Sequence, residues 1–495
     1  MNQSSKKAIV IGSGIAGMAA AIRLAVQGFE VKVFESNESP GGKLTSFESN
    51  GFLFDAGPSL FTQPENIEDL FTYAKEPIES YFQYSQVEVS CKYFFENKKT
   101  ITAYSDKEKL TKEFVDKLGE EPSAVINYLN NAEKLYQNIG SIFLNHSLHK
   151  SATWLHPRVI KALSSIKFGY LFSNLNKYNQ NNFSSKEAIQ IFNRFATYNG
   201  SNPYKAPAML SVIPHLEQNQ GTYYPKGGMI SITNSLYKLA VKKGVQFYFN
   251  HAVEKIIHHN KKVSGIVVNN DIVSADLVIS NGDVYYTYKN LLDLPNKVKK
   301  IEKQERSSSA VIFYWGIKKE FSELGLHNIL FSDHYQDEFN RIFTKKELSN
   351  DPTIYINITS KMEEGQAPTG KENWFVMINA PNNIGQNWSD LIIDLRKFVI
   401  QKINRILDTD IEKYIEVESI MDPVIIEQKT GTYKGALYGT SSNNSFAAFL
   451  RPANFLKKIQ GLYFCGGTVH PGGGIPLCLK SASITSEIIK KDYAH

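Results

Sequence analysis

A glycine-rich turn near the start of the chain limits the possible fold more than any other part of the sequence. Residues 8–11 (Ala-Ile-Val-Ile) predict a short buried strand, and residues 12–17 (Gly-Ser-Gly-Ile-Ala-Gly) follow it directly. Residues 18–25 favour a helix, residues 29–34 alternate like a second strand, and Glu35 ends that strand. Because the glycine motif follows a strand and opens a helix, this order is typical of a dinucleotide-binding βαβ unit.

Each glycine of this motif has a physical purpose. Gly12 permits the tight turn, Gly14 lets a pyrophosphate approach the backbone, and Gly17 lets the helix pack against the strand. The helix N-terminus adds free N–H groups and the positive end of a dipole, and both favour phosphate. Glu35 can accept hydrogen bonds from both hydroxyls of a ribose, and its charge would repel a 2′-phosphate.

Two further glycine segments indicate FAD rather than NAD. Residues 41–43 (Gly-Gly-Lys) let the chain pass close to a bulky cofactor, which a plain NAD dehydrogenase does not need. Residues 51–59 end in Gly-Pro-Ser. Together these segments resemble the FAD-binding half of the glutathione-reductase-like superfamily of amine oxidases, protoporphyrinogen oxidases and carotenoid desaturases. The resemblance implies that residues 41–43 lie against the ribityl and isoalloxazine parts of the flavin.

The C-terminal region carries the most specific motif. Residues 461–465 predict a strand, residues 466–476 (Gly-Gly-Thr-Val-His-Pro-Gly-Gly-Gly-Ile-Pro) follow it, and residues 477–489 predict a helix. A helix N-terminus preceded by glycines can approach a flat ring closely, and its dipole favours negative charge on a reduced flavin. This motif closely resembles that of bacterial phytoene-desaturase-type carotenoid enzymes. The resemblance spans nearly the whole chain and is weakest over residues 85–220.

The resemblance implies an α/β fold assembled from several pieces. Its centre is expected to be a discontinuous Rossmann-like FAD-binding domain of the glutathione-reductase type, with an inserted antiparallel-sheet substrate domain and a helical membrane-facing subdomain. The three parts of the FAD-binding domain are expected at residues 1–75, 220–285 and 426–495. Residues 76–219 are expected to form the helical, substrate- and membrane-facing subdomain, and residues 286–425 the substrate domain.

The motifs and the resemblance together give a set of candidate cofactor-binding residues. They are Gly12, Gly14, Ile15, Ala16, Gly17, Glu35, Gly41, Gly42, Lys43, Gly57, Pro58, Ser59, Val253, Gly467, Thr468, Gly474, Ile475 and Pro476. In the resembled superfamily, the backbone at the position of Val253 contacts the adenine. Lys43 stands where many relatives have Arg, and Thr468 stands where other flavoproteins have an acid. The Thr468 hydroxyl can still bond a ribityl or phosphate oxygen.

Two residues are candidates for a direct part in catalysis, and each has a structural alternative. Arg451 can place a positive charge near the flavin, or it can anchor its own loop. His470 can act as a base, or it can be a hydrogen-bonded histidine that holds a tight loop. The sequence leaves both pairs of alternatives open.

The resemblance implies an FAD-dependent carotenoid desaturase that introduces a C=C bond into an acyclic end by hydride transfer to flavin N5. Residues 57–64 (Gly-Pro-Ser-Leu-Phe-Thr-Gln-Pro) resemble hydroxycarotenoid and γ-carotenoid C-3′,4′ desaturases, which favours 3,4-desaturation of a 1-hydroxycarotenoid or a γ-carotenoid. The alternatives are a phytoene desaturase, a carotenoid isomerase, saturase or oxidase, an amine oxidase, and a non-catalytic carotenoid- or flavin-binding scaffold. Quinone or oxygen is the expected electron acceptor.

Composition excludes several other classes of function. The net charge is +6, and no concentrated basic patch of the kind that binds nucleic acid is evident. The 3 cysteines form no disulfide framework and no CxxC pair, so we expect a reducing, cytoplasmic environment and no metal site. The uncharged run at residues 8–22 falls short of the roughly 20 residues that a membrane-spanning helix needs.

A long basic segment suggests contact with a membrane surface. No acidic residue lies between Glu133 and Glu187, whereas basic and aromatic residues alternate through this segment. The segment is interpreted either as a membrane-touching lid or as an ordinary helical subdomain whose aromatic residues fill its own core. A carotenoid is too apolar to diffuse through the cytosol, because each CH₂ group favours the membrane by about 0.8 kcal/mol. We therefore expect a peripheral enzyme on the inner face of the cell membrane.

Overall fold

The computed structural model describes residues 5–154, 157, 159, 170, 173–444 and 451–493. Its first layer is a five-stranded parallel sheet in the order β19-β13-β1-β2-β9. The strands are β19 (Leu462–Phe464), β13 (Leu277–Ser280), β1 (Lys7–Ile11), β2 (Glu30–Phe34) and β9 (Gln246–Tyr248). Each strand lies within one of the three segments expected to form the FAD-binding domain, so distant parts of the chain meet in one sheet.

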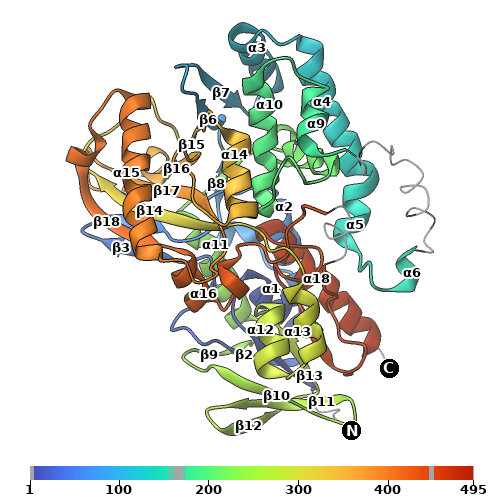
Figure 1. The fold of residues 1–495 in the computed structure, drawn as a ribbon. Helices are drawn as coiled ribbons and strands as arrows, with labels where there is room; N and C mark the ends of the chain where they lie inside the picture. The colour runs from blue at the N-terminus through green and yellow to red at the C-terminus, as the bar shows by residue number, and fades with distance from the viewer. Residues whose placement is uncertain are drawn as a thin grey trace.

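Three helices pack together beside this sheet (Figure 1). They are α1 (Ile15–Val26), α11 (Ile230–Lys242) and α18 (Ile475–Asp492), and α1 contacts both of the others. Helix α1 is almost entirely buried from Ile15 to Leu24, because its alanine-rich sequence allows neighbours to approach it from several sides. The shorter helix α2 (Glu65–Ala74) closes this layer against α1 and α18.

A small antiparallel meander lies at one end of the molecule. It consists of β10 (Val253–His259), β11 (Lys262–Val268) and β12 (Asp271–Ser274), at the bottom of Figure 1. Helices α12 (Val284–Tyr286) and α13 (Pro295–Glu302) follow β13 and share a hydrophobic core with the meander. These elements leave the C-terminal ends of the parallel strands close to the glycine-rich segments.

The second large layer is a seven-stranded sheet in the order β18-β14-β17-β16-β15-β6-β7. Its strands are β18 (Ile415–Met421), β14 (Ser309–Ile317), β17 (Glu372–Ala380), β16 (Ile354–Ile358), β15 (His327–Leu330), β6 (Val89–Phe94) and β7 (Thr100–Tyr104). All neighbouring strands pair antiparallel except β15 and β6. The antiparallel sheet expected within residues 286–425 is therefore present, and it is extended by a hairpin from earlier in the chain.

The two faces of this sheet have different neighbours. Helix α15 (Trp388–Leu407) packs its apolar side against one face, where Trp315 and Trp374 are fully buried. The other face carries Tyr314 and Phe375 and packs against the hairpin of β3 (Ser46–Ser49) and β4 (Phe52–Asp55), which follows the first glycine segments. This second face is consequently directed toward the candidate site. Helix α16 (Pro423–Thr430) follows β18 beside β14.

A helical group occupies the upper right of Figure 1. Its helices include α3 (Lys107–Leu118), α4 (Pro122–Leu135), α5 (Ser141–Asn145), α6 (Ser151–Trp154), α9 (Leu175–Gln180) and α10 (Lys186–Asn193), with α14 (Tyr335–Asn340) alongside. Residues 76–219 are thus largely helical, as expected, but they also supply β6 and β7. A further strand from this stretch, β5 (Tyr84–Gln86), pairs with β8 (Tyr223–Pro225).

The aromatic residues of the basic segment have different surroundings. The ring of Tyr178 lies 5.5 Å from that of buried Tyr128 and 5.4 Å from that of Tyr170, so Tyr178 belongs to the core of the helical group. Trp154 is 39% exposed. Phe168, Leu171 and Phe172 lie outside the described residues. Within the described part of the chain, no helix is both long and apolar enough to cross a membrane.

Candidate functional site

The first glycine turn forms the cradle that its sequence predicts. The amide of Gly12 donates to the Phe34 carbonyl at 2.8 Å, which ties the turn to β2. A Cβ atom on Gly17 would lie 2.1 Å from the Gly12 carbonyl oxygen, and one on Gly14 would lie 2.8 Å from Asn281 Oδ1. Gly14 is the N-cap of α1, and no side chain caps this helix. The amide groups of the first turn therefore remain available to an anion, in the geometry that suits a pyrophosphate.

Glu35 lies beside this cradle and is 5% exposed. Its Oε2 accepts hydrogen bonds from the Ser13 amide and hydroxyl, both at 2.8 Å. Its Oε1 accepts from the Asn37 amide at 3.0 Å and from Asn37 Nδ2 at 2.8 Å. A carboxylate has about four lone-pair positions, so ribose hydroxyls can bond to Glu35 only when side-chain donors such as Ser13 Oγ give way.

The candidate adenine contact is close to Glu35. The amide of His251 donates to the Glu35 carbonyl at 2.8 Å, and Val253 follows two residues later at the start of β10. The side chain of Val253 is buried in the core shared with the meander. The structure thus brings Val253 and Glu35 together, although more than two hundred residues separate them in sequence.

The second glycine segment lies against the first. Gly14 and Gly41 form an isolated parallel bridge, and a Cβ atom on Gly42 would lie 3.3 Å from the Gly14 Cα. Gly41 and Gly42 have φ angles of +116° and +62°, which side-chain-bearing residues rarely adopt. Lys43 then extends away from the turn, and its Nζ donates to the Leu437 carbonyl at 2.7 Å. Burial lowers the pKa of Lys43, and the nearby Asp283 carboxylate opposes that shift.

The third segment, residues 57–59, continues from the same place. A Cβ atom on Gly57 would lie 1.7 Å from the Lys43 carbonyl oxygen, so only glycine allows the two strands of chain to pass there. Pro58 is exposed, and the Ser59 hydroxyl lies 2.8 Å from the Tyr355 hydroxyl of β16. Ser59 therefore joins the candidate flavin segments to the seven-stranded sheet.

The C-terminal motif closes the site from the opposite side. Gly467 and Gly473 approach each other so closely that a Cβ atom on Gly467 would lie 3.2 Å from the Gly473 Cα. Gly474, with a φ of +101°, is the N-cap of α18, and no side chain caps that helix either. Ile475 and Pro476 begin the helix, two residues before the start that the sequence predicts. Two uncapped helix N-termini, those of α1 and α18, thus flank the same set of glycine segments.

The Thr468 side chain already takes part in a hydrogen bond within the protein. Its Oγ1 accepts a hydrogen bond from the Val284 amide at 3.1 Å, and its Cβ lies 3.4 Å from the position that a Cβ on Gly439 would take. The hydroxyl hydrogen of Thr468 is still free to donate to a cofactor oxygen. A threonine hydroxyl can donate a hydrogen bond at this position, whereas an ionised acid, which other flavoproteins carry there, can only accept one.

Arg451 is 3% exposed and bonds to backbone. Its Nη1 donates to the Tyr438 carbonyl at 2.6 Å and to the Gly467 carbonyl at 3.2 Å. A Cβ on Gly472 would lie 3.1 Å from Arg451 Nε, so the C-terminal glycine loop packs directly on the guanidinium. Burial lowers the pKa of Arg451 to about 10. This geometry makes Arg451 an anchor for the loop and also brings a buried cation close to it.

His470 is held in the same loop by backbone groups. Its Nε2 lies 2.8 Å from the His146 carbonyl oxygen, which can only accept, so Nε2 carries the proton. The His470 amide also donates to the Pro452 carbonyl at 2.9 Å. Burial lowers the pKa of His470 to about 4, which keeps the ring neutral. These contacts match the alternative in which His470 holds a tight loop.

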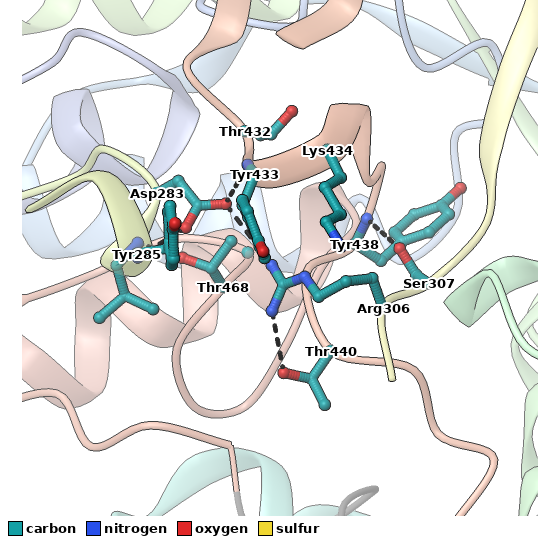
Figure 2. A network of polar contacts seen from close by, with 12 residues as sticks. Asp283, Tyr285, Arg306, Ser307, Thr432, Tyr433, Lys434, Tyr438, Thr440 and Thr468 are labelled. Atoms are coloured by element: carbon teal, nitrogen blue, oxygen red, sulfur yellow. Dashed lines mark hydrogen bonds and ion pairs between the residues drawn. The ribbon is translucent and has the colours of Figure 1, made fainter. Parts of the chain in front are cut away.

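Sequence reasoning missed a buried polar network around Asp283, which Figure 2 shows. Asp283 accepts from the Tyr285 amide at 2.7 Å, and its Oδ2 lies 3.7 Å from Arg306 Nη2. The rings of Tyr285 and Tyr433 stack with centroids 3.8 Å apart. Residues 280–283 (Ser-Asn-Gly-Asp) and 435–439 (Gly-Ala-Leu-Tyr-Gly) are motifs of the resembled family, and this was the available signal.

The network leaves an excess of buried positive charge beside the glycine segments. Arg306 and Arg451 are 5% and 3% exposed, and Asp283 is the carboxylate that faces Arg306. Arg306 Nε and Nη2 have no hydrogen-bond partner among the described residues. Together with the two helix N-termini, these cations suit a group that bears negative charge, as FAD does at its pyrophosphate. The residues present therefore fit the expected cofactor.

Comparisons with known proteins show which family the chain resembles. Residues 15–489 match the family described as flavin containing amine oxidoreductase. The 1-hydroxycarotenoid 3,4-desaturase of Flavobacterium sp. (strain P99-3) is 49% identical over 489 residues, covering 99% of this chain and 100% of that relative. The 4,4′-diapolycopene oxygenase of Methylomonas sp. is 31% identical, with 99% of each chain covered.

Solved structures share the fold at low sequence identity. An oxidoreductase from Methanosarcina mazei has a TM-score of 0.64 and 18% identity, covering 98% of this chain and 100% of its own. Cyclohexylamine oxidase from Brevibacterium oxydans has a TM-score of 0.61 and 14% identity, covering 99% and 100%. The α/β fold expected from the sequence is therefore confirmed, as is the flavin-dependent character of its family.

Proposed function

The chain belongs to the flavin containing amine oxidoreductase family, and from this premise we propose that it is an FAD-dependent carotenoid desaturase acting on the 3,4 bond of a 1-hydroxycarotenoid. The observation that carries this proposal is the 49% identity to a 1-hydroxycarotenoid 3,4-desaturase across the full length of both chains. The reading of the motifs as those of a carotenoid enzyme is thereby confirmed.

The alternatives have weaker support. The carotenoid oxygenases are 30–31% identical, well below the desaturase, so terminal oxidation is less favoured. Amine oxidases share the fold at 13–14% identity, which carries no information on substrate. A non-catalytic scaffold is less favoured because the relative that is 49% identical over both full lengths is named as a desaturase.

We assign the following tasks to the residues of the site. The turn at Gly12, Gly14 and Gly17, together with Ile15 and Ala16 at the start of α1, binds the pyrophosphate through backbone amides. Glu35 and the backbone of Val253 orient the adenosine end. Residues 41–43, 57–59 and 474–476 enclose the ring end, and Gly467 and Thr468 hold the ribityl chain between them.

Desaturation removes a hydride from one allylic carbon and a proton from its neighbour. FAD, when bound, supplies the hydride acceptor. The protein positions the two partners, and its buried cations favour the negative charge that the cofactor gains. Arg451 acts here as a positioning residue that also contributes charge. His470 Nε2 cannot take up the departing proton, because it already donates to the His146 carbonyl.

The substrate and the site of action follow from the same proposal. A carotenoid stays in the bilayer, because burying each CH₂ group is worth about 0.8 kcal/mol. We infer that the protein binds peripherally to the inner face of the cell membrane through the basic segment between Glu133 and Glu187, and that quinone or oxygen takes up the electrons.

The test uses the purified holoprotein with added FAD in liposomes under anaerobic conditions. Lycopene, γ-carotene and their 1-hydroxylated forms are supplied separately, and flavin bleaching and product mass are recorded. The proposal requires bleaching coupled to the loss of two hydrogens, fastest with a 1-hydroxylated substrate. Absence of bleaching with all four compounds, despite confirmed FAD binding, would overturn it. A gain of oxygen when air is admitted would favour the terminal oxidase instead.

A further inference from the structure

The face of the seven-stranded sheet that is directed toward the flavin segments carries aromatic and aliphatic side chains around Tyr314 and Phe375, and polar side chains at a few places, one of them beside a candidate flavin segment. At that place the side chains of Ser59, His327, Tyr355 and Asn357 form one hydrogen-bonded group, which we call the hydroxyl cluster. Tyr355 and Asn357 lie on β16 and His327 on β15, with His327 paired opposite Asn357. His327 is 3% exposed and Asn357 is 3% exposed, so the group is buried.

The contacts of the hydroxyl cluster fix the proton on His327. Asn357 Nδ2 donates to the Leu326 carbonyl at 3.1 Å, which identifies this atom as the amide nitrogen. The same Nδ2 lies 3.1 Å from His327 Nδ1, and a nitrogen that only donates requires Nδ1 to accept. The Tyr355 hydroxyl lies 2.8 Å from the same Nδ1 and 2.8 Å from the Ser59 hydroxyl. Since burial keeps the ring neutral, its proton is on Nε2.

His327 Nε2 has no hydrogen-bond partner in the described part of the chain. Buried donors are nearly always satisfied, and leaving one unpaired costs about 1–3 kcal/mol. The position is therefore a buried N–H group that requires an acceptor from outside the described residues. It is surrounded on the sheet face by aromatic groups: the Tyr355 ring lies 6.2 Å from Phe375, and Phe375 lies 5.6 Å from Tyr314.

An ion pair near the hydroxyl cluster affects the protonation of the His327 ring. Arg194 and Glu217, which are 7% and 1% exposed, pair with each other, and Arg194 also donates to the Tyr93 hydroxyl. The positive charge of Arg194 helps to lower the pKa of His327. Burial and the charge of Arg194 together discourage a second proton on the ring, so Nδ1 stays an acceptor.

A hydroxyl next to the reacting bond has to lie close to the flavin. In a 1-hydroxycarotenoid that reacts at carbons 3 and 4, three bonds of about 1.5 Å separate the oxygen from carbon 3. The reacting carbon approaches its partner to about 3–3.5 Å, so the hydroxyl is held within roughly 10 Å of the flavin. Ser59, two residues beyond Gly57 in a candidate flavin segment, bonds directly to Tyr355.

We propose that His327 Nε2 donates a hydrogen bond to the 1-hydroxyl oxygen of the substrate, and that the hydroxyl cluster is the site that selects hydroxylated over unhydroxylated carotenoids. This inference rests on the proposed function and adds the residues that set its substrate preference. It also accounts for a buried polar group on a sheet face that carries aromatic and aliphatic side chains. His327 is a specificity-determining residue here, and Tyr355 and Asn357 position it.

The test compares two substitutions of the same residue in the FAD-loaded full-length protein. His327→Asn keeps a polar atom near Nδ1 and removes the donor at Nε2, whereas His327→Gln restores an amide donor near Nε2. For each, kcat/KM and the equilibrium binding constant are measured in liposomes with lycopene and with its 1-hydroxylated form. His215→Asn is the matched control, because His215 is also buried and its Nδ1 also faces an amide nitrogen, that of Asn219.

We expect His327→Asn to lower the preference for the hydroxylated substrate at least tenfold through that substrate alone, as loss of a buried hydrogen bond implies. His327→Gln should keep the preference within about threefold of the wild type, and His215→Asn should leave it unchanged. If His327→Asn keeps the wild-type preference for the hydroxylated substrate, the inference is overturned. The acceptor of the Nε2 hydrogen bond is then a structural water. If His327→Asn lowers kcat/KM equally with both substrates, the inference is also overturned, because the substitution then acts through packing.

Two further results separate a folding defect of the variant, and a wrong assignment of function, from a wrong assignment of the hydroxyl cluster. FAD content and thermal denaturation show whether His327→Asn folds. If it does not, Tyr355→Phe replaces it, because this change removes the hydroxyl that orients His327 and keeps the ring. An unchanged substrate preference in Tyr355→Phe counts against the inference. Wild-type protein that desaturates lycopene and its hydroxylated form equally well leaves the desaturase standing and overturns the hydroxyl cluster. Wild-type protein that binds FAD but desaturates none of the four compounds named above overturns both proposals.

Discussion

Glu35 shows how a single buried carboxylate can link the protein to a cofactor. It accepts from Ser13 on one side and from Asn37 on the other, so it organises the glycine turn and the start of the following loop at the same time. We predict that Glu35→Gln weakens FAD binding by roughly tenfold or more, because an amide places a donor against the Ser13 N–H. The measurement is the dissociation constant from flavin fluorescence. Glu30→Gln, on the same strand but partly exposed, should bind FAD like the wild type; equal affinity of both variants would contradict the assignment.

Arg451 allows the two roles expected of it to be separated by experiment. Both carbonyls that it serves, those of Tyr438 and Gly467, belong to the segments that meet at the C-terminal glycine loop. We predict that Arg451→Met and Arg451→Lys both lower the free energy of unfolding, by about 1–3 kcal/mol, because neither side chain reproduces the bonds of a guanidinium. Denaturant titration with FAD bound gives the value. Full stability in Arg451→Lys, with loss only in Arg451→Met, would instead favour charge as its main contribution.

His470 gives the protein a defined response to acid. Its pKa is lowered from 6.5 to about 4 by burial, so between these values the unfolded chain binds more protons than the native one. The stability contributed by the neutral ring is complete above pH 6.5 and is lost as the pH falls toward 4. We predict that the free energy of unfolding decreases between pH 7.5 and pH 5 by about 2 kcal/mol more in the wild type than in His470→Gln. Asp55 shifts in the opposite sense, but it is present in both proteins and cancels in the difference.

At the scale of elements, the turn between β1 and α1 is one of the most closely packed places in the site. A Cβ on Gly17 would lie 2.1 Å from a backbone oxygen, which cannot move without opening the βαβ unit. We predict that Gly17→Ala costs at least about 1–3 kcal/mol of stability and abolishes FAD retention on purification. Gly325→Ala is the control, because its nearest neighbours are side-chain atoms of Lys92 at 3.7 Å and its backbone is unstrained. Retention of FAD by Gly17→Ala would contradict the close packing described for this turn.

Elements whose signals are local were predictable from the sequence. The bounds of helix α11, Ile230 and Lys242, follow from local signals, because a glycine turn precedes it and its apolar positions recur at helical spacing. The candidate residues of the glycine segments were also predictable, since φ angles such as that of Gly42 leave few alternatives to glycine. Whether those residues bind FAD as assigned stays a prediction.

Contacts that depend on tertiary structure were not predictable. The hydroxyl cluster joins Ser59 to Tyr355 across almost three hundred residues, and no spacing along the chain reveals such a contact. Strands β6 and β7 fall in a stretch that is otherwise helical, and they are strands because they complete the edge of a sheet built mainly from later residues. Likewise, Lys43 bonds to Leu437 although the sequence suggested only a contact with the flavin.

At the scale of the whole molecule, the proposed division into parts has a functional consequence. The parallel sheet draws its strands from the first, middle and last parts of the chain, so the flavin segments come together only when the entire protein has folded. The seven-stranded sheet is joined to those segments by the bond between Ser59 and Tyr355. Under the proposed function the carotenoid comes from a bilayer, so its entrance has to open there.

The basic segment is the part of the chain best suited to face that bilayer, and its charge can be tested directly. Each Lys near an anionic surface contributes about 1 kcal/mol, so we predict that Lys161→Gln with Lys167→Gln weakens binding of the holoprotein to phosphatidylglycerol vesicles by about tenfold or more in low salt. The control pair is Lys397→Gln with Lys413→Gln, two exposed residues on or after α15, far from the segment in sequence. Cosedimentation at low and high salt measures the effect, which should shrink at 1 M salt because screening there acts over about 3 Å. Equal binding by the two double variants would remove the basic segment from the membrane contact and leave the apolar residues of the helical group as the docking surface.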